Sequence, residues 1–189
     1  MRIVGGMWRG RPIDAPEGRG TRPTTDRMRE TLASMILSAE ELDLGGVSVL
    51  DAFAGSGAVG LELLSRGASS CTFCERDRRA AALVRANCQR LGAHKDSWRI
   101  ITGDVTRTVA RGLWGAPFRV VYLDPPYAMD AVVVAGLVEA LRTSGQLEAG
   151  CLVVYERAPE AEELSLTGFE KLRSRVVASS CVDLLRMQG

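Results

Sequence analysis

The chain has 189 residues, of which 46% are hydrophobic and 25% are charged, and its formal net charge is +1. A chain of this size and composition buries one substantial core and leaves little room for a second full domain. No apolar run approaches the roughly 20 residues that a membrane span requires, and the N-terminus lacks the pattern of a signal or transit peptide. We therefore expect a cytoplasmic protein without a membrane segment.

The cysteines and the histidine give no reason to expect a disulfide framework or a metal site. The five cysteines are odd in number and lie mostly inside apolar runs, which is typical of reduced thiols packed as small hydrophobic groups. Cys71 and Cys74 have CxxC spacing, but they belong to a predicted strand in which positions three apart point to opposite faces. His94 is the single histidine and has no second candidate ligand nearby. We expect no bound metal.

Positive charge is concentrated near the N-terminus. Residues 1–29 contain seven arginines and three acidic residues, a formal charge of +4, which leaves −3 for the rest of the chain. Residues 1–23 are rich in glycine, arginine and proline, and we expect an appendage that forms a small β-hairpin but no core. A basic arm on a slightly acidic body favours an anionic partner such as nucleic acid. The same composition is also typical of a solvated, flexible arm.

The remaining chain alternates between helical and strand patterns. A helix is predicted from Thr24 onward through residue 39, because apolar residues then recur at helical spacing. Predicted strands cover residues 47–50, 70–75, 99–102, 119–123 and 151–155, and helical patterns cover 58–66, 81–91, 105–113 and 130–144. This alternation predicts an α/β fold with a mainly parallel, doubly wound sheet. Two further strands, 169–177 and 181–187, follow without a helix between them, so we expect an antiparallel hairpin to finish a seven-stranded sheet.

A glycine-rich loop follows the first of these strands. Gly55, Gly57 and Gly60 match the dinucleotide-binding pattern GxGxxG, and Glu75 lies at the distance expected of a ribose-binding acid. This pattern alone does not separate NAD from S-adenosylmethionine. Two details favour S-adenosylmethionine: Asp51 ends the strand where a carboxylate reaches the cofactor's amino group, and no basic residue follows the glycines to meet a pyrophosphate.

A third acidic residue follows the next strand. Asp104 comes directly after the predicted strand 99–102, where its carboxylate could accept a hydrogen bond from an adenine amino group. Asp51, Glu75 and Asp104 therefore follow three consecutive strands, and we expect them to line one crevice. Acidic residues also commonly cap helices that follow strands, which is the alternative explanation.

The segment Asp124 to Tyr127 leaves the predicted strand 119–123 directly into a turn with the sequence DPPY. An exocyclic base amine is a poor nucleophile because its lone pair is delocalised into the ring. The Asp124 carboxylate and the Pro125 carbonyl can each accept one of its N–H groups, while Pro125 and Pro126 fix φ and remove competing backbone donors. Tyr127 offers a flat face on which an extruded base can stack. This segment therefore predicts methyl transfer to an amino group of a nucleic-acid base, with orientation and proximity as the main source of catalysis.

These segments together resemble the class I S-adenosylmethionine-dependent methyltransferases, and more narrowly the bacterial 16S ribosomal RNA guanine-N2 methyltransferases of the RsmD type. The resemblance is carried by DAFAGSGAVG (51–60), DPPY (124–127), RPTTDRMRETLASMI (22–36) and the opening MRIVGGMWRGRPI (1–13). It covers essentially the whole chain. It implies a Rossmann-like fold, with residues 24–189 as the methyltransferase domain and residues 1–23 as a basic extension that contacts RNA.

The resemblance also implies a cofactor, a substrate and site residues. The cofactor is S-adenosylmethionine, and the target is a guanine of 16S RNA in the assembled or assembling 30S subunit, modified by a protein that we expect to be a monomer. The implied cofactor-binding residues are Asp51, Ala54, Gly55, Ser56, Gly57, Glu75, Arg76, Asp104 and Val105. The implied catalytic residues are Asp124, Pro125, Pro126 and Tyr127. The implied RNA-binding residues are Arg9, Arg11, Arg19, Arg22, Arg27 and Arg29.

Two other functions remain open at this point. A DNA adenine-N6 methyltransferase would share DPPY and the fold, but reading a duplex sequence normally requires a further recognition domain, for which this chain has no room. A non-catalytic nucleotide-binding module that uses residues 55–60 for NAD would leave Asp124 and Tyr127 without a role.

Overall fold

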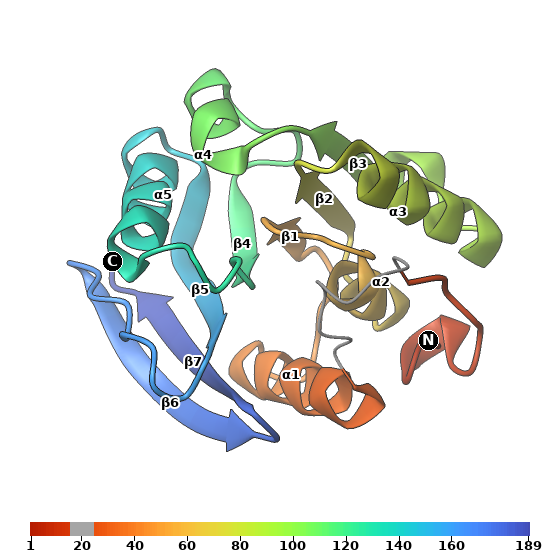
Figure 1. Cartoon of the computed structure of the whole chain (residues 1–189), viewed down its shortest axis with the longest axis horizontal. Helices are drawn as coiled ribbons and strands as arrows, with labels where there is room; N and C mark the ends of the chain where they lie inside the picture. The colour runs from red at the N-terminus through yellow and green to blue at the C-terminus, as the bar shows by residue number, and fades with distance from the viewer. Residues whose placement is uncertain (16–24) are drawn as a thin grey trace.

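The computed structural model describes residues 1–15 and 25–189, in which seven strands form one sheet in the order β3-β2-β1-β4-β5-β7-β6 (Figure 1). The strands are β1 (Ser48–Asp51), β2 (Ser70–Glu75), β3 (Trp98–Thr102), β4 (Phe118–Leu123), β5 (Leu147–Arg157), β6 (Phe169–Val177) and β7 (Ser180–Met187). Neighbours among β1 to β5 pair in parallel, whereas β7 pairs antiparallel with both β5 and β6. The predicted seven-stranded, mostly parallel sheet with an antiparallel C-terminal hairpin is confirmed.

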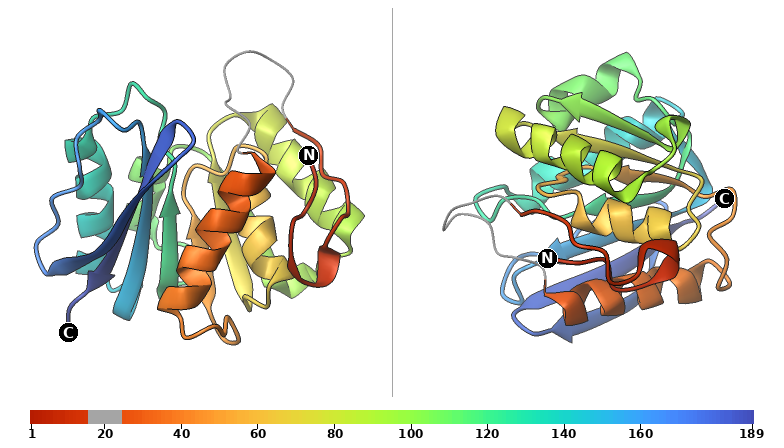
Figure 2. Two further views of the ribbon diagram at one scale, coloured as in Figure 1. Left: turned by 90° about the horizontal axis from the view of Figure 1, so that it is seen from below. Right: turned by 90° about the vertical axis from the view of Figure 1, so that its right-hand side faces the viewer.

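Helices cover both faces of this sheet. They are α1 (Asp26–Ala39), α2 (Ala58–Ser65), α3 (Arg78–Leu91), α4 (Val105–Thr108) and α5 (Ala131–Thr143), with short 3-10 turns η1 (Gly6–Trp8), η2 (Lys95–Ser97) and η3 (Val109–Arg111). Buried residues of α1, α2 and α3 share one apolar cluster with one face of the sheet, and those of α4 and α5 share a second cluster with the other. The left view of Figure 2 shows α1 and α5 on opposite sides of the strands.

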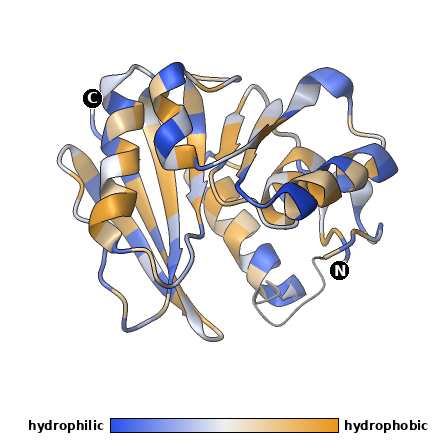
Figure 3. Cartoon of the chain, turned by 45° about the horizontal axis from the view of Figure 1, so that its top comes forward, coloured by the Kyte–Doolittle hydropathy of each residue, from blue (hydrophilic) through white to orange (hydrophobic). Residues whose placement is uncertain are grey.

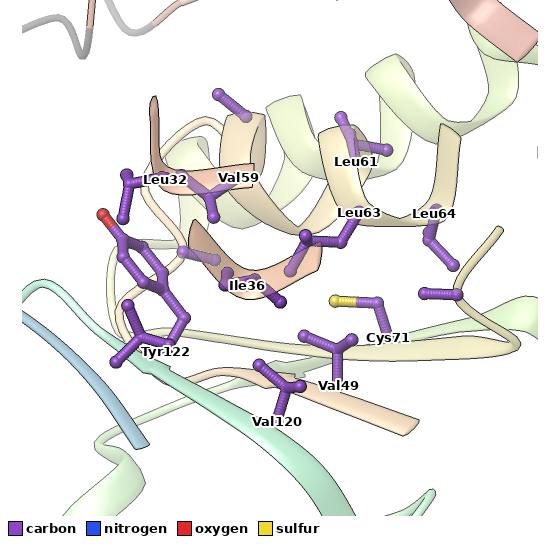
Figure 4. Packing of buried hydrophobic residues seen from close by; sticks show 14 of the residues in the cluster. Leu32, Ile36, Val49, Val59, Leu61, Leu63, Leu64, Cys71, Val120 and Tyr122 are labelled. Atoms are coloured by element: carbon purple, nitrogen blue, oxygen red, sulfur yellow. The ribbon is translucent and has the colours of Figure 1, made fainter. Parts of the chain in front are cut away.

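The central strands are strongly hydrophobic (Figure 3), and their residues form the core together with the inner faces of the helices. Leu32 and Ile36 of α1 pack over the sheet face that carries Val49, Val120 and Tyr122 (Figure 4). Each of these five residues is at most 2% exposed, so burial of this apolar surface is a main source of stability.

Cys71 and Cys74 lie on opposite faces of β2. Cys71 belongs to the cluster under α2 and Cys74 to the cluster under α4 and α5, as strand alternation predicts. All five cysteines are free and buried. Four of the thiols pack in the apolar clusters, whereas the Cys181 thiol donates to Asp183 Oδ1 at 3.7 Å.

Local capping explains where helices begin and end. The Asp77 side chain accepts the first backbone N–H groups of α3, and Gly92, with φ of 66°, ends that helix where the sequence predicts. The single helix predicted over residues 105–113 is instead a four-residue helix, α4, followed by the turn η3. Gly112 has φ of 75°, a left-handed conformation that does not continue a helix.

The N-terminal segment differs from the prediction. It folds back on itself, but within residues 1–15 the only strand pairing is one isolated bridge between Arg2 and Pro12. The segment was expected to form no core, and in the structure its Ile3, Trp8 and Ile13 side chains are instead buried in the same cluster as α1 and α2. Residues 16–24, which connect this segment to α1, lie outside the described residues.

The anchoring of the N-terminal segment is polar as well as apolar. The Glu62 carboxylate on α2 accepts the backbone N–H groups of Val4 at 2.8 Å and Gly5 at 2.7 Å. The Ser65 hydroxyl, one helical turn further, accepts the N–H of Trp8 at 2.9 Å. These bonds satisfy backbone donors that burial would otherwise leave without a partner, so the segment is fixed to α2.

Candidate active site

The direction of the strand order reverses between β1 and β4. From β1 the chain proceeds outward through β2 and β3 and then returns to the other side of β1 as β4. In open α/β sheets ligands bind at this switch point, outside the carboxyl ends of the strands. Asp51 ends β1 and Asp124 directly follows β4, whose residues pair in register with β1. The two halves of the predicted site therefore share one edge of the sheet.

The Asp51 carboxyl group is buried and only half satisfied. Its Oδ2 atom accepts the backbone N–H of Gly60 at 3.2 Å, whereas Oδ1 has no hydrogen-bond partner among the described residues. Burial raises the pKa of Asp51 to about 7, opposed by the backbone amides of Gly60 and Phe53 and reinforced by the charge of Glu75. A buried acceptor without a donor destabilises the fold, so Oδ1 suits a ligand that carries a charged N–H donor.

The three glycines of the motif after β1, of which Gly60 lies in the first turn of α2, have different roles. A Cβ atom on Gly57 would approach Val84 Cγ1 to 2.9 Å, and one on Gly60 would approach Phe73 Cε1 to 2.4 Å. These two glycines allow α2 to pack closely against α3 and β2. Gly55 has φ of 54°, and a Cβ atom there would meet nothing within 4 Å. The backbone at Gly55 is therefore open to a ligand.

Glu75, at the end of β2, holds the glycine loop in place. Its Oε2 atom accepts the N–H of Gly55 at 2.8 Å, and its Oε1 atom accepts the N–H of Asp77 at 2.7 Å. Each carboxylate oxygen retains a second lone pair that can accept a hydroxyl donor. The position next to the loop is the one predicted for an acid that binds ribose.

Asp104 follows β3 at the same edge of the sheet and caps α4. Its carboxylate accepts the Thr106 hydroxyl at 2.7 Å and the Thr106 N–H at 3.0 Å. These hydrogen bonds, with the charges of Arg107 and Arg76, hold the pKa of Asp104 below its usual range. The capping role that the sequence left open is thus observed. The side chain is 45% exposed, so lone pairs remain accessible at this edge.

The other predicted cofactor residues lie around the same strand ends. Ala54 and Val105 are buried, and Arg76 is exposed next to Glu75. The carbonyl oxygen of Ser56 accepts the Asn87 side-chain amide at 3.1 Å, which ties the loop to α3. The structure therefore brings this predicted set together along the ends of β1, β2 and β3.

A pocket of about 710 Å³ opens beside the ends of β4 and β5. Its walls are formed by Asp124, Pro125, Pro126, Tyr127 and Met129 on one side, and by residues 155–161 with Ser179 and Ser180 on the other. This volume is within the roughly 300–1,000 Å³ of small-molecule sites. Tyr127 is 73% exposed at this pocket, and its ring can stack on a flat ligand.

The Asp124 carboxyl group lies in an acidic environment. Desolvation by the surrounding protein atoms, together with the charges of Glu156 and Asp51, raises the pKa of Asp124 to about 8. The residue still reaches solvent through the pocket. Three carboxyl groups from β1, β4 and β5 therefore converge where a polar ligand with N–H donors would be stabilised.

Sequence reasoning missed one residue of this pocket, Glu156. The register of β4 and β5 pairs Leu123 with Tyr155, which places Glu156 beside Asp124. Glu156 is 8% exposed, lines the pocket, and accepts the Tyr122 hydroxyl at 2.6 Å through Oε2. The signal that could have identified it is its place after the apolar run of the fifth strand, the same criterion that identified Asp124.

The arginines predicted to contact RNA have different environments. Arg9 and Arg27 are exposed. Arg11 is also exposed, but its guanidinium group donates to the carbonyl oxygens of Arg90 and Leu91 at the end of α3. Arg19 and Arg22 lie outside the described residues.

The prediction of RNA contact is wrong for Arg29. This residue is 1% exposed, and its guanidinium group donates to Asp26 Oδ1 at 2.6 Å and to the carbonyl oxygen of Arg2 at 2.7 Å. Helical spacing places it on the buried face of α1 with Met28 and Leu32. Arg29 therefore stabilises the junction of α1 with the N-terminal segment.

Within residues 1–15 and 25–189, no three His, Cys, Asp or Glu side chains gather closely enough to hold a metal ion. In the same part of the chain, no helix combines the length and hydrophobicity that crossing a membrane requires.

Known proteins similar to this chain match it over most of its length. The sequence model of the family described as "Conserved hypothetical protein 95" matches residues 1–186. The chain is 36% identical over 164 residues to "Ribosomal RNA small subunit methyltransferase D" of Escherichia coli (strain K12), covering 85% of this chain and 76% of that protein. It is 35% identical over 156 residues to the Haemophilus influenzae protein of the same name, covering 82% and 78%. The solved structure "Putative methyltransferase yhhF from Escherichia coli" matches with a TM-score of 0.84 and 31% identity, covering 100% of this chain and 98% of that one.

Proposed function

The chain belongs to the family described as "Conserved hypothetical protein 95", and on that premise we propose that it methylates the exocyclic N2 amine of a guanine in 16S ribosomal RNA. It is an S-adenosylmethionine-dependent ribosomal RNA methyltransferase. Our proposal concerns the target atom, guanine N2, and is supported by the resemblance of the sequence and by the chemistry of the pocket.

The residues at the ends of β1 and β2 fit this cofactor. S-adenosylmethionine, when bound, supplies an electrophilic methyl group on a sulfonium sulfur. The buried Oδ1 of Asp51 lacks a donor, and the ammonium group of an amino acid moiety would provide one. Glu75 presents carboxylate oxygens suited to ribose hydroxyls, and Gly55 leaves its backbone uncovered.

The residues after β4 prepare the amine. The Asp124 carboxylate and the Pro125 carbonyl oxygen each accept an N–H group, which favours a nitrogen whose lone pair points out of the base plane. Pro125 and Pro126 lack backbone N–H groups that would compete for these acceptors. Tyr127 stacks on the extruded base. The chain's contribution is then orientation, because the amine loses its proton readily once it carries the methyl group.

The observation that carries this proposal is the place of Asp124 and Tyr127. Both line a pocket of about 710 Å³ at the same sheet edge as Asp51, so a base in this pocket lies beside the cofactor crevice. The charge of Asp51 is strong enough at Asp124 to contribute to its raised pKa, which supports the proximity of the two subsites.

We further propose that the RNA is presented within the assembled or assembling 30S subunit, in the cytoplasm, to a monomer of this chain. The exposed side chains of Arg9 and Arg27 are suited to phosphate oxygens, whereas Arg11 donates to carbonyl oxygens at the end of α3.

Tritiated methyl transfer tests the proposal. The substrates are 30S particles from cells that lack this modification, naked 16S RNA, and duplex DNA, each followed by nucleoside analysis. We expect N2-methylguanosine from the 30S particles. Recovery of N6-methyladenine from DNA, or a methylated nucleoside other than N2-methylguanosine from the RNA, would refute it.

A further inference from the structure

Glu156 is the buried carboxylate of the base pocket to which the proposed chemistry assigns no role. It lies near the end of β5, and its neighbour Tyr155 pairs with Leu123 of β4. Side chains alternate along a strand, so Glu156 points to the same face as Tyr122 and Asp124. The 2.6 Å hydrogen bond from the Tyr122 hydroxyl to Glu156 Oε2 agrees with this placement.

The second carboxylate oxygen of Glu156 is available to a ligand. The Tyr122 hydroxyl uses Oε2, whereas Oε1 has no hydrogen-bond partner among the described residues. In the same part of the chain Glu156 takes part in no ion pair, and its neighbour Arg157 donates instead to Asp183 at 2.7 Å. Glu156 is 8% exposed and lines the pocket that Asp124 lines. A nearly buried acceptor therefore stands next to the residue that binds the amine.

The far wall of the pocket is held in place by Arg157. Its Nη1 atom donates to the carbonyl oxygens of Ala158, Pro159 and Ala161. The loop over residues 158–161 is thus fixed opposite Tyr127, and the pocket keeps its shape. A shaped pocket can select a base by the pattern of donors and acceptors along its edge.

The bases that carry an exocyclic amine differ in the ring nitrogen beside it. In guanine this atom is N1–H, a donor, whereas in adenine and cytosine it is an acceptor. An acceptor placed beside the amine-binding Asp124 would bind N1–H of guanine. With adenine or cytosine, the same acceptor would face the lone pair of the ring nitrogen, so two acceptors would meet without a donor between them.

We propose that Glu156 is the specificity-determining residue for guanine, with its Oε1 atom accepting N1–H while Asp124 and Pro125 hold the N2 amine. This inference rests on the proposed function, because it concerns recognition of the same base. The Tyr122 hydroxyl is a positioning group that holds the carboxylate in one orientation.

The first test uses the unmodified enzyme and one altered base. The probes are 30S particles reassembled with 16S RNA that carries either guanine or 2-aminopurine at the nucleotide that the enzyme methylates. 2-Aminopurine keeps the N2 amine but has an acceptor at N1. We expect kcat/KM to be about 100-fold or more lower for 2-aminopurine. Values that agree within about threefold would overturn the role of Glu156 without affecting the proposed function.

The second test changes Glu156 itself. Glu156→Gln keeps the shape and an acceptor for the Tyr122 hydroxyl, but turns an amide donor toward N1. We expect methylation of guanine to fall by about 100-fold, and discrimination against 2-aminopurine to shrink to less than about tenfold. The matched control is Glu162→Gln, an exposed residue outside the lining of the pocket, which should retain the guanine preference.

The outcomes separate the two proposals. A wild-type enzyme that produces no N2-methylguanosine on any RNA would refute the proposed function. A wild-type enzyme that produces it, with a Glu156→Gln variant whose discrimination is unchanged, would refute only the role of Glu156. Binding of S-adenosylmethionine, measured by calorimetry, should be the same in both proteins, which distinguishes impaired base recognition from a distorted fold.

Discussion

The backbone N–H of Gly60 donates to Oδ2 of Asp51 across 3.2 Å, joining the first turn of α2 to the end of β1. This bond fixes the carboxylate in the crevice, while Oδ1 stays buried and unpartnered within the described residues. Asp51 is thus placed for a ligand at the expense of the ligand-free fold. Functional sites commonly hold groups that the rest of the protein would be more stable without.

Asp51→Asn should therefore have opposite effects on binding and stability. We expect the affinity for S-adenosylmethionine to fall at least about tenfold, because the variant cannot form the charge-assisted hydrogen bond. The pKa of Asp51 is raised from 3.8 to about 7 in the folded protein, so the wild type loses stability as pH rises from about 4 to above 7. The neutral amide avoids this loss, which is on the order of 2–4 kcal/mol.

Urea denaturation of the cofactor-free proteins at pH 5 and pH 8, with calorimetric titration, measures both effects. The free energy of unfolding of Asp51→Asn, relative to that of the wild type, should increase from pH 5 to pH 8. Asp96→Asn is the matched control, because it removes the same charge from a side chain that is 91% exposed. A stability difference between Asp51→Asn and wild type that does not change with pH would contradict the burial of a charged Asp51.

Alanine substitutions at Gly55 and Gly60 should affect cofactor binding and packing to different extents. Gly60→Ala places a methyl group 2.4 Å from Phe73 Cε1, so we expect the free energy of unfolding to fall by about 1–3 kcal/mol or more. Gly55→Ala meets no atom within 4 Å but imposes a left-handed φ of 54° on alanine, which costs about 1–2 kcal/mol. Its larger effect should be on the affinity for S-adenosylmethionine.

Chemical denaturation and calorimetry on both variants check this difference. We expect Gly60→Ala to lower the free energy of unfolding more than Gly55→Ala does. For Gly55→Ala, we expect the affinity for S-adenosylmethionine to fall by more than the loss of stability explains. If affinity fell in proportion to stability in both variants, Gly55 would be a packing residue like Gly60.

The fold and the two main motifs were predictable because local patterns determine them. Buried parallel strands are short apolar runs, and each of β1 to β4 is followed here by a helix, so the order of elements is visible in the sequence. Parallel strands bring their carboxyl ends to one edge. The positions of Asp51, Glu75 and Asp124 follow from that rule alone.

The N-terminal segment was not predictable in this way. Ile3, Trp8 and Ile13 are separated by glycines and arginines and follow neither helical nor strand periodicity. Their burial depends on α2, where Glu62 and Ser65 accept backbone N–H groups from residues more than 50 positions away. Such long-range partners leave no local signal. The burial of Arg29, by contrast, follows from helical spacing, because this residue precedes Leu32 by three positions and Ile36 by seven on the apolar face of α1. Its charge alone suggested RNA contact.

The Asp124 carboxylate should control the pH dependence of the reaction. Only its ionised form accepts an N–H group through both oxygens, and its pKa is raised to about 8. With S-adenosylmethionine saturating, we therefore expect kcat/KM for RNA to rise with pH and level off above about 8. Asp124→Asn should lower the plateau by about 10²–10⁴-fold and remove this rise. A wild-type profile that is flat between pH 6 and 9 would contradict the assignment.

Tyr127 should affect RNA binding without affecting stability. The ring is 73% exposed, so Tyr127→Ala should change the free energy of unfolding by less than about 0.5 kcal/mol. Removal of the ring that stacks on the base should weaken productive RNA binding by about 1–3 kcal/mol, measured as kcat/KM on 30S particles. Tyr127→Phe is the matched control and should retain activity, because a phenyl ring stacks as well. Equal decreases in both variants would assign the role to the hydroxyl group instead.

The arginines near the N-terminus should divide into one RNA-binding pair and one structural residue. Arg9 and Arg27 are exposed, and the variant with both changed to alanine should bind 30S particles more weakly, with a smaller dependence of affinity on salt. Removing a side chain that neutralises one phosphate lowers the slope of log affinity against log salt by about 0.7–0.9. Arg29→Ala should instead lower the free energy of unfolding by about 1–3 kcal/mol, because its buried guanidinium group bonds Asp26 and the Arg2 carbonyl.

Filter binding at several salt concentrations and chemical denaturation distinguish these roles. Arg29→Ala should keep the wild-type salt slope in whatever fraction remains folded, since the Arg29 side chain is 1% exposed. If the double variant had the wild-type slope, Arg9 and Arg27 would not touch the RNA, and the recognition surface would have to be sought elsewhere on the chain. If Arg29→Ala changed the salt slope without lowering the free energy of unfolding, the Arg29 guanidinium group would have to leave Asp26 and the Arg2 carbonyl oxygen and contact the RNA.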